Sequence, residues 1–289
     1  MKEINRIFLD HACRIADEVK AKALVLYADA ASELPITKTE KPCFNLVLVT
    51  KGEKELPEEL KDTGTVINVP AVNLTRVGQI KIAITKGIAM GLFKKGDKLV
   101  CISGLPKLGY VDSIFMIDVG KEFEVLTSQN ITDITQCVHP EVFSEALNIV
   151  LELAAQGREG RKVGTILVLG DHEKVLQLSR QMVINPFQGY KEEERNILNP
   201  DLLETIKEFS AIDGAFVIKD NGAIVTAGRH LNAAIESKDF PQGLGSRHIA
   251  AAGITDVTHA IAIVLSESTG NVSVFKNGKI FVSILKPIP

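Results

Sequence analysis

Two short stretches of the sequence combine residue types that can act on a phosphorylated ligand. In the first, Asp213, Gly214 and Ala215 stand between a helix-like pattern and an apolar run. An acid in such a place can bind a metal ion, act as a base or simply cap a turn. The small residues after it leave room for a ligand to approach the backbone. Residue types alone leave all three roles open.

The second stretch, GLGSRH at 243–248, is a glycine-containing loop that brings Ser246, Arg247 and His248 together. Backbone N–H groups and a guanidinium fork are donors that suit phosphate oxygens. A small-residue helix is expected directly after the loop, and its N-terminus would favour an anion. The loop matches neither the Walker pattern nor the Rossmann fingerprint. His248 taken alone is equally well explained as a packed, hydrogen-bonded histidine.

A third polar stretch follows an apolar run near the C-terminus. Ser266, Glu267, Ser268 and Thr269 come directly after AIAIVL at 260–265. Ligand groups often lie at strand ends, but hydroxyl residues before a glycine also describe an ordinary turn. The turn is the simpler account of this stretch in isolation.

The composition excludes several classes of function. The 289 residues carry a formal net charge of -3, with a pI near 6.1. A duplex-DNA binder usually shows a basic excess, so no nucleic-acid partner is expected. No apolar run approaches the roughly 20 residues that span a bilayer, so no membrane partner is expected. The four cysteines include no C-x-x-C pair, which argues against structural zinc. We expect a cytoplasmic protein.

The first 120 residues alternate helical and strand-like patterns. Apolar spacing predicts helices at 5–20 and 75–93. Short apolar runs predict strands at 23–28, 44–50, 66–70 and 99–104. This alternation predicts a three-layer α/β domain with a mostly parallel sheet.

Residues 121–139 lose clear periodicity and lead to Pro140, so the domain boundary is placed there. The N-terminal domain is predicted at 1–125 and the C-terminal domain at 140–289. The second domain is expected to be a mixed-sheet α/β domain flanked by helices. Helices are predicted at 140–157, 172–182 and 201–212, and a strand at 163–171. From residue 213 onward strands dominate, and the Asn-Gly pairs at 221–222 and 277–278 are typical hairpin turns.

Taken in this order, the segments resemble the diadenylate cyclase (DAC) domain, which makes cyclic di-AMP from two ATP molecules. The resemblance rests on DGA at 213–215, GSRHIAA at 245–251 and SESTG at 266–270. It covers roughly residues 140–289 and looks like the soluble, archaeal-type branch of the family. The N-terminal part, especially the stretch from Gly91 to Gly120, is similar to the C-terminal α/β domain of pyruvate kinase.

The resemblance implies roles for particular residues. Asp213 would hold a catalytic Mn²⁺ or Mg²⁺ ion, and Arg247 and His248 would be catalytic residues that bind the phosphates. Leu231 would line the adenine pocket. The remaining ATP-binding residues implied in this way are Gly214, Ala215, Gly245, Ser246, Ser266 and Glu267.

The sequence departs from the family at Ile249, where a second arginine is usual. Lys219, Arg229 and His230 are the candidates to supply the missing cation.

The implied reaction condenses two ATP molecules into cyclic di-AMP and two pyrophosphates. Because each ATP must react with the other, we expect a homo-oligomer in which two DAC domains face each other. The alternative is a nucleotide-binding sensor without turnover, which the loss of the arginine at position 249 favours. The N-terminal domain has no catalytic motif, so ligand sensing and a purely assembly-promoting role both remain open.

Overall fold

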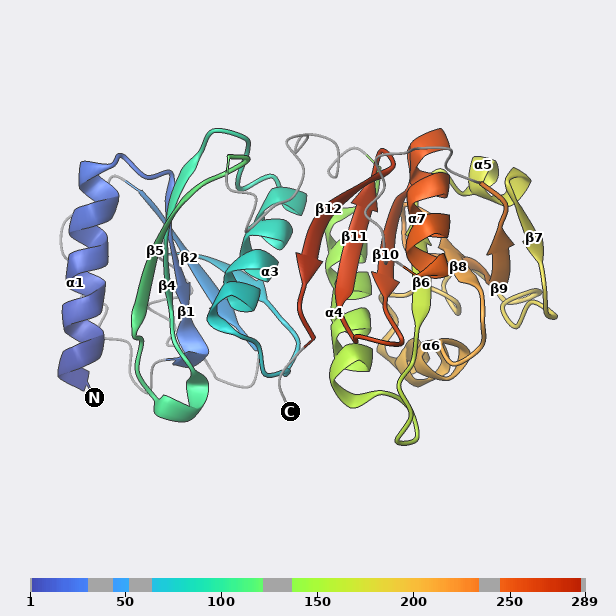
Figure 1. Cartoon of the computed structure of the whole chain (residues 1–289), viewed down its shortest axis with the longest axis horizontal. Coiled ribbons are helices and arrows are strands. Elements are labelled where there is room, and N and C mark those ends of the chain that lie inside the picture. Colours follow the sequence, from blue (N-terminus) through green and yellow to red (C-terminus); the bar gives the residue numbers. More distant parts are fainter. Residues whose placement is uncertain (1, 31–43, 52–63, 122–136, 234–244, 287–289) are drawn as a thin grey trace. The chain divides into compact units, whose positions relative to one another are not determined.

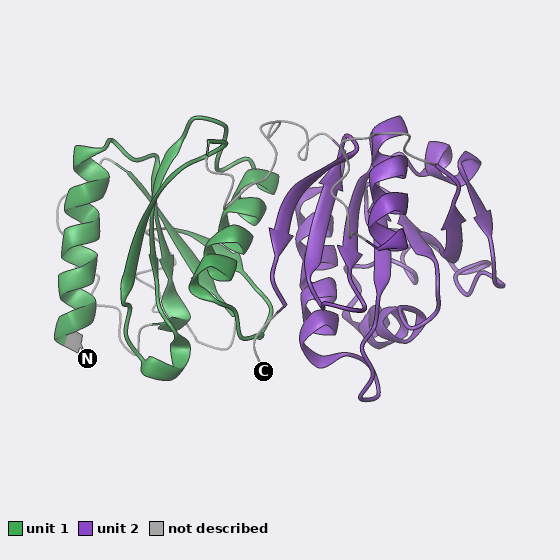
Figure 2. Cartoon of the chain, viewed as in Figure 1, with its two compact units in different colours: residues 1–129 green, residues 130–289 purple. Residues whose placement is uncertain are grey.

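The computed structural model describes residues 2–30, 44–51, 64–121, 137–233 and 245–286 (Figure 1). The chain divides into two compact units, residues 1–129 and 130–289 (Figure 2). The predicted limits of the two domains, residues 125 and 140, bracket a segment that lies largely outside the described residues. Among the described residues, no helix is both long and apolar enough to cross a membrane.

The first unit is built on a sheet of five strands in the order β3-β2-β1-β4-β5. The pairings of β1 with β2, β2 with β3 and β1 with β4 are parallel, as the alternating pattern predicts. An edge strand that the sequence analysis did not identify, β5, pairs antiparallel with β4. The strands are β1 (Ala23–Tyr27), β2 (Asn45–Thr50), β3 (Gly64–Asn68), β4 (Lys98–Ser103) and β5 (Ser113–Asp118).

Helices cover both faces of this sheet, α1 (Lys2–Glu18) on one side and α3 (Arg76–Ala89) on the other (Figure 1). The unit therefore has the predicted three layers. Thr75 caps α3, because its hydroxyl accepts a hydrogen bond from the Gly78 backbone N–H at 3.0 Å. Short 3-10 helices follow β1, as η1 (Ala28–Ala30), and β4, as η2 (Pro106–Leu108).

The second unit contains a mixed sheet of seven strands in the order β12-β11-β10-β6-β8-β9-β7. Only the pairing of β6 with β8 is parallel, and the others are antiparallel. The strands are β6 (Thr165–Leu169), β7 (Ser179–Gln181), β8 (Ala215–Ile218), β9 (Ile224–Leu231), β10 (Ile261–Leu265), β11 (Val272–Lys276) and β12 (Lys279–Ile284). The mixed-sheet prediction is confirmed.

Helices α4 (Pro140–Gln156) and α7 (Ser246–Val257) lie on opposite faces of this sheet (Figure 1). Successive strand residues point to opposite faces, so Ile166 and Val168 pack on the α7 side, in one core cluster with Ala251 and Ile254. Small residues on α7 let the helix approach the sheet closely. The remaining helices are α5 (His172–Gln177), η3 (Pro200–Leu202) and α6 (Leu203–Phe209).

The predicted helix at 172–182 is wrong in its second half. Helix α5 ends at Gln177, and residues 179–181 form β7, which pairs antiparallel with β9. The end of the helix is fixed from a distance, because the Arg229 guanidinium donates to the carbonyl oxygens of Leu176 at 3.0 Å and Ser179 at 2.7 Å. The apolar spacing of this segment could not reveal a partner 50 residues away.

The two Asn-Gly turns are confirmed. Asn277 and Gly278 both have positive φ, 51° and 72°, as a two-residue turn between β11 and β12 requires. At the other turn, the Lys219 backbone N–H donates to the carbonyl oxygen of Ala223 at 2.9 Å.

Candidate nucleotide site

Three strand ends meet at one edge of the second sheet. Since β6 runs parallel to β8 and antiparallel to β10, the starts of β6 and β8 lie beside the end of β10. Gly164 precedes β6, Asp213 comes two residues before β8, and Ser266 follows β10. The topology thus gathers two of the three polar stretches singled out in the sequence.

The N-terminus of α7 brings the third stretch to the same place. The Arg247 guanidinium joins two carboxylates, through Nη1 to Glu267 at 2.9 Å and through Nη2 to Asp213 at 3.3 Å. The arginine side chain is 25% exposed, whereas those of Asp213 and Glu267 are 81% and 57% exposed. The carboxylates therefore remain open to solvent while they orient a mostly buried guanidinium.

Glycine at position 164 makes this arrangement possible. A Cβ atom there would lie 2.8 Å from Nη1 of Arg247 and 2.8 Å from Cβ of Glu267. Any larger residue would displace the ion pair. The sequence analysis assigned no role to Gly164.

An open cleft of about 610 Å³ surrounds the arginine. Its walls come from three segments: the connection between α4 and β6, the first turn of α7, and the turn after β10. The lining residues are Arg161, Lys162, Gly245, Ser246, Arg247, His248, Ser266, Glu267 and Ser268. Five of the predicted ATP-binding positions other than Arg247 are among them.

His248 lies at the back of this cleft and is 6% exposed. Its ring packs edge-on against Phe275, with ring centroids 5.9 Å apart. Burial lowers the pKa of the imidazole from its ordinary value of 6.5. The ring is therefore neutral near pH 7, and it can donate one N–H or accept one proton.

Four predicted site residues are not among those that line the cleft: Asp213, which reaches it through its ion pair with Arg247, and Gly214, Ala215 and Leu231. Gly214 has a φ of +115°, and a Cβ there would lie 2.7 Å from the carbonyl carbon of Gly228 in β9. Ala215 is fully buried in β8, and Leu231 is 6% exposed and packs in the core cluster beneath α7. The positive φ and the close approach of β9 explain why residue 214 is glycine. A nucleotide contact at Gly214, Ala215 or Leu231 stays a prediction.

The stretch from Ser266 to Gly270 is a turn, as its residue types suggest. The Ser266 carbonyl oxygen accepts from the Gly270 N–H at 2.8 Å, and the Ser266 hydroxyl accepts from the Thr269 N–H at 3.3 Å. The turn also presents Glu267 to Arg247. A nucleotide contact of Ser266 or Glu267 stays a prediction.

None of the three candidates for the missing cation lines the cleft. Lys219 is paired with Glu192, and Arg229 is bound to the backbone around Ser179. Partial burial lowers the pKa of Arg229 from its ordinary value. His230 is exposed on β9 but is not among the residues around Arg247.

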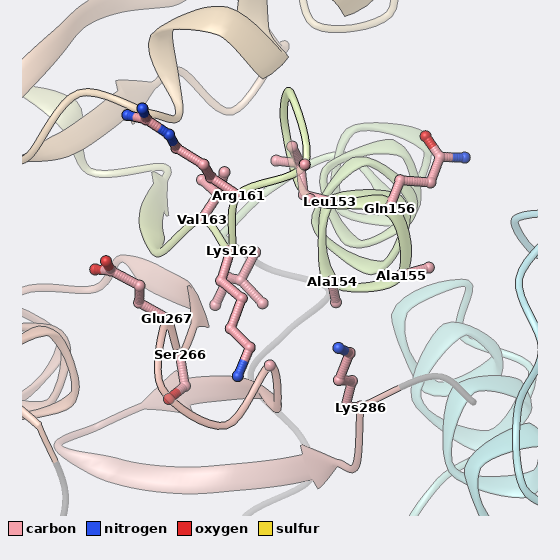
Figure 3. A pocket seen from close by; sticks show the side chains of 14 residues that line it. Leu153, Ala154, Ala155, Gln156, Arg161, Lys162, Val163, Ser266, Glu267 and Lys286 are labelled. Carbon is pink, nitrogen blue, oxygen red and sulfur yellow. The ribbon is translucent and has the colours of Figure 1, made fainter. Parts of the chain in front are cut away.

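Two basic residues that the sequence analysis missed, Arg161 and Lys162, do line the cleft. They also border a smaller pocket of about 170 Å³ between the end of α4 and the turn after β10 (Figure 3). Figure 3 shows the two side chains leaving the backbone in different directions, with Lys162 extending toward Ser266 and Arg161 pointing away from it. The available signal was a pair of adjacent cations, RK, directly before a strand.

The donors present suit a divalent cation that keeps most of its coordination outside the protein. Among the described residues, no group of three or more His, Cys, Asp or Glu side chains is arranged to hold a metal ion. Asp213 nevertheless offers an open carboxylate beside Arg247 and the N-terminus of α7. Mg²⁺ and similar hard cations often bind through one or two carboxylates together with substrate phosphates.

The chain is similar to known proteins over most of its length. Residues 152–280 match a family model described as DisA bacterial checkpoint controller nucleotide-binding, and residues 5–127 match one described as a probable sensor domain. A diadenylate cyclase from Methanocaldococcus jannaschii is 30% identical over 298 residues, covering 96% of this chain and 95% of that protein. One from Haloferax volcanii is 34% identical over 230 residues, covering 79% and 82%.

A solved structure, that of DacA from Staphylococcus aureus, is 22% identical, with a TM-score of 0.34, and covers 50% of this chain and 88% of that one.

The fold and the matched models define a two-unit α/β protein whose second unit matches the DisA nucleotide-binding family model. The chain belongs to the diadenylate cyclase family, in its archaeal type, a family of nucleotidyltransferases that make cyclic di-AMP. The resemblance of the first unit to pyruvate kinase stays a prediction.

Proposed function

We propose that the chain condenses two ATP molecules into cyclic di-AMP and two pyrophosphates. Each 3′-hydroxyl attacks the α-phosphate of the other nucleotide, so two P–O bonds form and two pyrophosphate groups leave. The observation that carries this proposal is the pairing of Arg247 with Asp213 and Glu267, beside a cleft at the N-terminus of α7 that Arg247 and Glu267 line.

Such a reaction needs alignment and charge neutralisation more than covalent chemistry. Arg247 and the N-terminal N–H groups of α7 would bind phosphate oxygens, and Ser246 would add a hydroxyl donor. His248, held neutral by burial, would donate its N–H to a phosphate oxygen. Asp213 would hold a Mn²⁺ or Mg²⁺ ion, which would supply charge neutralisation at the α-phosphate.

The proposal requires two copies of the chain. One cleft holds one ATP, and the reaction joins two nucleotides symmetrically, so two second units would face each other across a two-fold axis. Asp213 suits this arrangement because its carboxylate is 81% exposed while it pairs with Arg247.

A product assay tests the proposal. Purified full-length chain is incubated with ATP and either Mn²⁺ or Mg²⁺, and the mixture is examined by mass spectrometry for cyclic di-AMP. We expect cyclic di-AMP and pyrophosphate in a ratio of one to two. Binding of ATP without product under either metal would overturn the proposal and favour the alternative function, a nucleotide sensor.

A further inference from the structure

The cleft around Arg247 lacks positive charge for a triphosphate. Arg247 already faces two carboxylates, those of Asp213 and Glu267. One cation against two anions leaves this group with a local charge of about −1, which repels phosphates. The metal ion proposed at Asp213 would act at the α-phosphate, so cations of the protein are still sought for the β- and γ-phosphates.

Arg161 and Lys162 are the other cations on the walls of this cleft, within the part of the chain that the structure describes. Both side chains are exposed. No acidic side chain among the described residues pairs with Arg161, and the Lys162 ammonium reaches only the carbonyl oxygen of Ser268, at 3.4 Å. Adding the two charges changes the local balance to about +1.

The backbone that carries these residues is held firmly. Arg158 and Arg161 exchange two backbone hydrogen bonds of 2.9 and 2.8 Å around Glu159 and Gly160, whose φ values of 47° and 74° describe a tight turn. The Arg158 guanidinium is itself anchored by Glu204 and Glu208 on α6. Arg161 and Lys162 therefore extend from a fixed turn, so little backbone freedom is lost when they bind a ligand.

The Lys162 side chain is also on the face of its segment that meets Arg247 and Glu267. Alternate residues of an extended chain face the same way, so Lys162 shares a face with Gly164, against which Arg247 and Glu267 pack. Val163, between them, is buried.

We propose that Arg161 and Lys162 bind the β- and γ-phosphates of ATP, the part that leaves as pyrophosphate. This inference rests on the proposed function and extends it. The two residues take the place of the cation that the family resemblance leads one to expect at Ile249, which is 45% exposed in the first turn of α7.

Binding measurements without turnover test this inference. The probe is 3′-deoxy-ATP, which lacks the attacking hydroxyl, and its affinity is measured by calorimetry with Mg²⁺ present. For Arg161→Ala/Lys162→Ala we expect the dissociation constant to rise at least about tenfold, since charge-assisted hydrogen bonds are lost. The affinity for AMP, which has no β- or γ-phosphate, should change less than about twofold.

Two further variants complete the test. Adding Ile249→Arg to the double variant should recover part of the lost affinity for 3′-deoxy-ATP, because a cation returns to the cleft. Lys279→Ala, an exposed lysine on β12, removes a charge outside the cleft and should leave the affinity unchanged. Unchanged affinity in the double variant, or an equal loss for AMP, would overturn the inference.

Failure of the phosphate-binding role can be distinguished from failure of the cyclase proposal. A wild-type chain that binds 3′-deoxy-ATP through these residues but makes no product from ATP would refute the cyclase proposal alone. A wild-type chain that makes product while the double variant binds normally would refute only the phosphate-binding role.

Discussion

Arg247 is the residue around which the others are ordered. Its guanidinium is mostly buried, and its Nε atom is buried without a hydrogen-bond partner among the described residues. Two carboxylates fix the direction of the fork, so the nitrogen atoms are oriented before a ligand arrives. Asp213 is therefore both an orienting partner for Arg247 and the proposed metal ligand.

The substitution Asp213→Asn tests whether Asp213 matters for activity rather than for stability. We expect the rate of cyclic di-AMP formation to fall at least about a hundredfold, because the metal ligand is lost. The melting temperature should barely change, because an ion pair with an 81% exposed carboxylate contributes little to stability. Product formation and thermal unfolding are the measurements, and Asp201→Asn, an exposed aspartate in η3, is the control. A full rate in Asp213→Asn would remove the metal assignment.

Burial of His248 makes stability depend on pH. The folded state holds its pKa below the ordinary 6.5, so below about pH 6.5 the unfolded chain binds a proton more readily than the folded chain. Stability should fall as the pH is lowered through this window and stay level above it. In His248→Gln, the difference in melting temperature between about pH 7.5 and about pH 5.5 should shrink. His11→Gln, at an exposed position on α1, should keep the wild-type difference; an unchanged difference in His248→Gln would contradict the assignment.

Sequence patterns singled out three polar stretches that the structure brings side by side, but not the basic residues next to them. Asp213, Arg247 and Glu267 carry recognisable motifs, and the structure brings them together as expected. Gly164, Arg161 and Lys162 were missed because their roles depend on which strand ends lie side by side. A pair of basic residues before a strand is common, and only the pairing of β6 with β10 shows that Lys162 faces the turn at 266–270.

At the scale of elements, the sequence predicted those turns and helix ends that depend on neighbouring residues. Asn-Gly turns and the Pro140 helix start were predictable because turn and helix-start preferences act within a few residues. The end of α5 and the short strand β7 were not, since Arg229, about 50 residues later, supplies the hydrogen bonds that stop the helix. The antiparallel edge strand β5 likewise depends on its neighbour β4 rather than on a pattern of its own.

Just before β8, the backbone at Gly214 comes very close to the neighbouring strand β9. A substitution there tests whether this close approach requires glycine. Gly214→Ala places a Cβ within 2.8 Å of the β9 backbone at a φ of +115°. We expect a loss of unfolding free energy of about 2 kcal/mol or more, seen as a lower melting temperature. Gly189→Ala is the matched control, because its φ is +90° and no atom lies within 4 Å of the added Cβ. Equal losses in the two variants would mean that the close approach to β9 costs nothing.

At the scale of the whole molecule, one surface beside the site is unusually apolar. Met182, Val183 and Ile184 follow β7 and are 42%, 40% and 93% exposed. This segment lies close to the site, because Val183 packs over Gly228, whose added Cβ would be 4.0 Å from the Asp213 carbonyl oxygen. Consecutive exposed apolar residues are costly in water unless another surface covers them. Their position next to Asp213 fits a second copy of the chain that docks there.

Ile184→Asp tests this contact. A charge at a buried interface weakens association, so we expect a larger fraction of monomer in sedimentation experiments. At low protein concentration the rate of cyclic di-AMP formation per chain should fall, and raising the concentration should restore it, because each cleft is intact and only pairing is impaired. Met116→Asp, at a 58% exposed apolar position on β5, serves as the control and should behave as wild type. Full activity of a verified Ile184→Asp monomer, independent of concentration, would show that one chain completes the reaction alone.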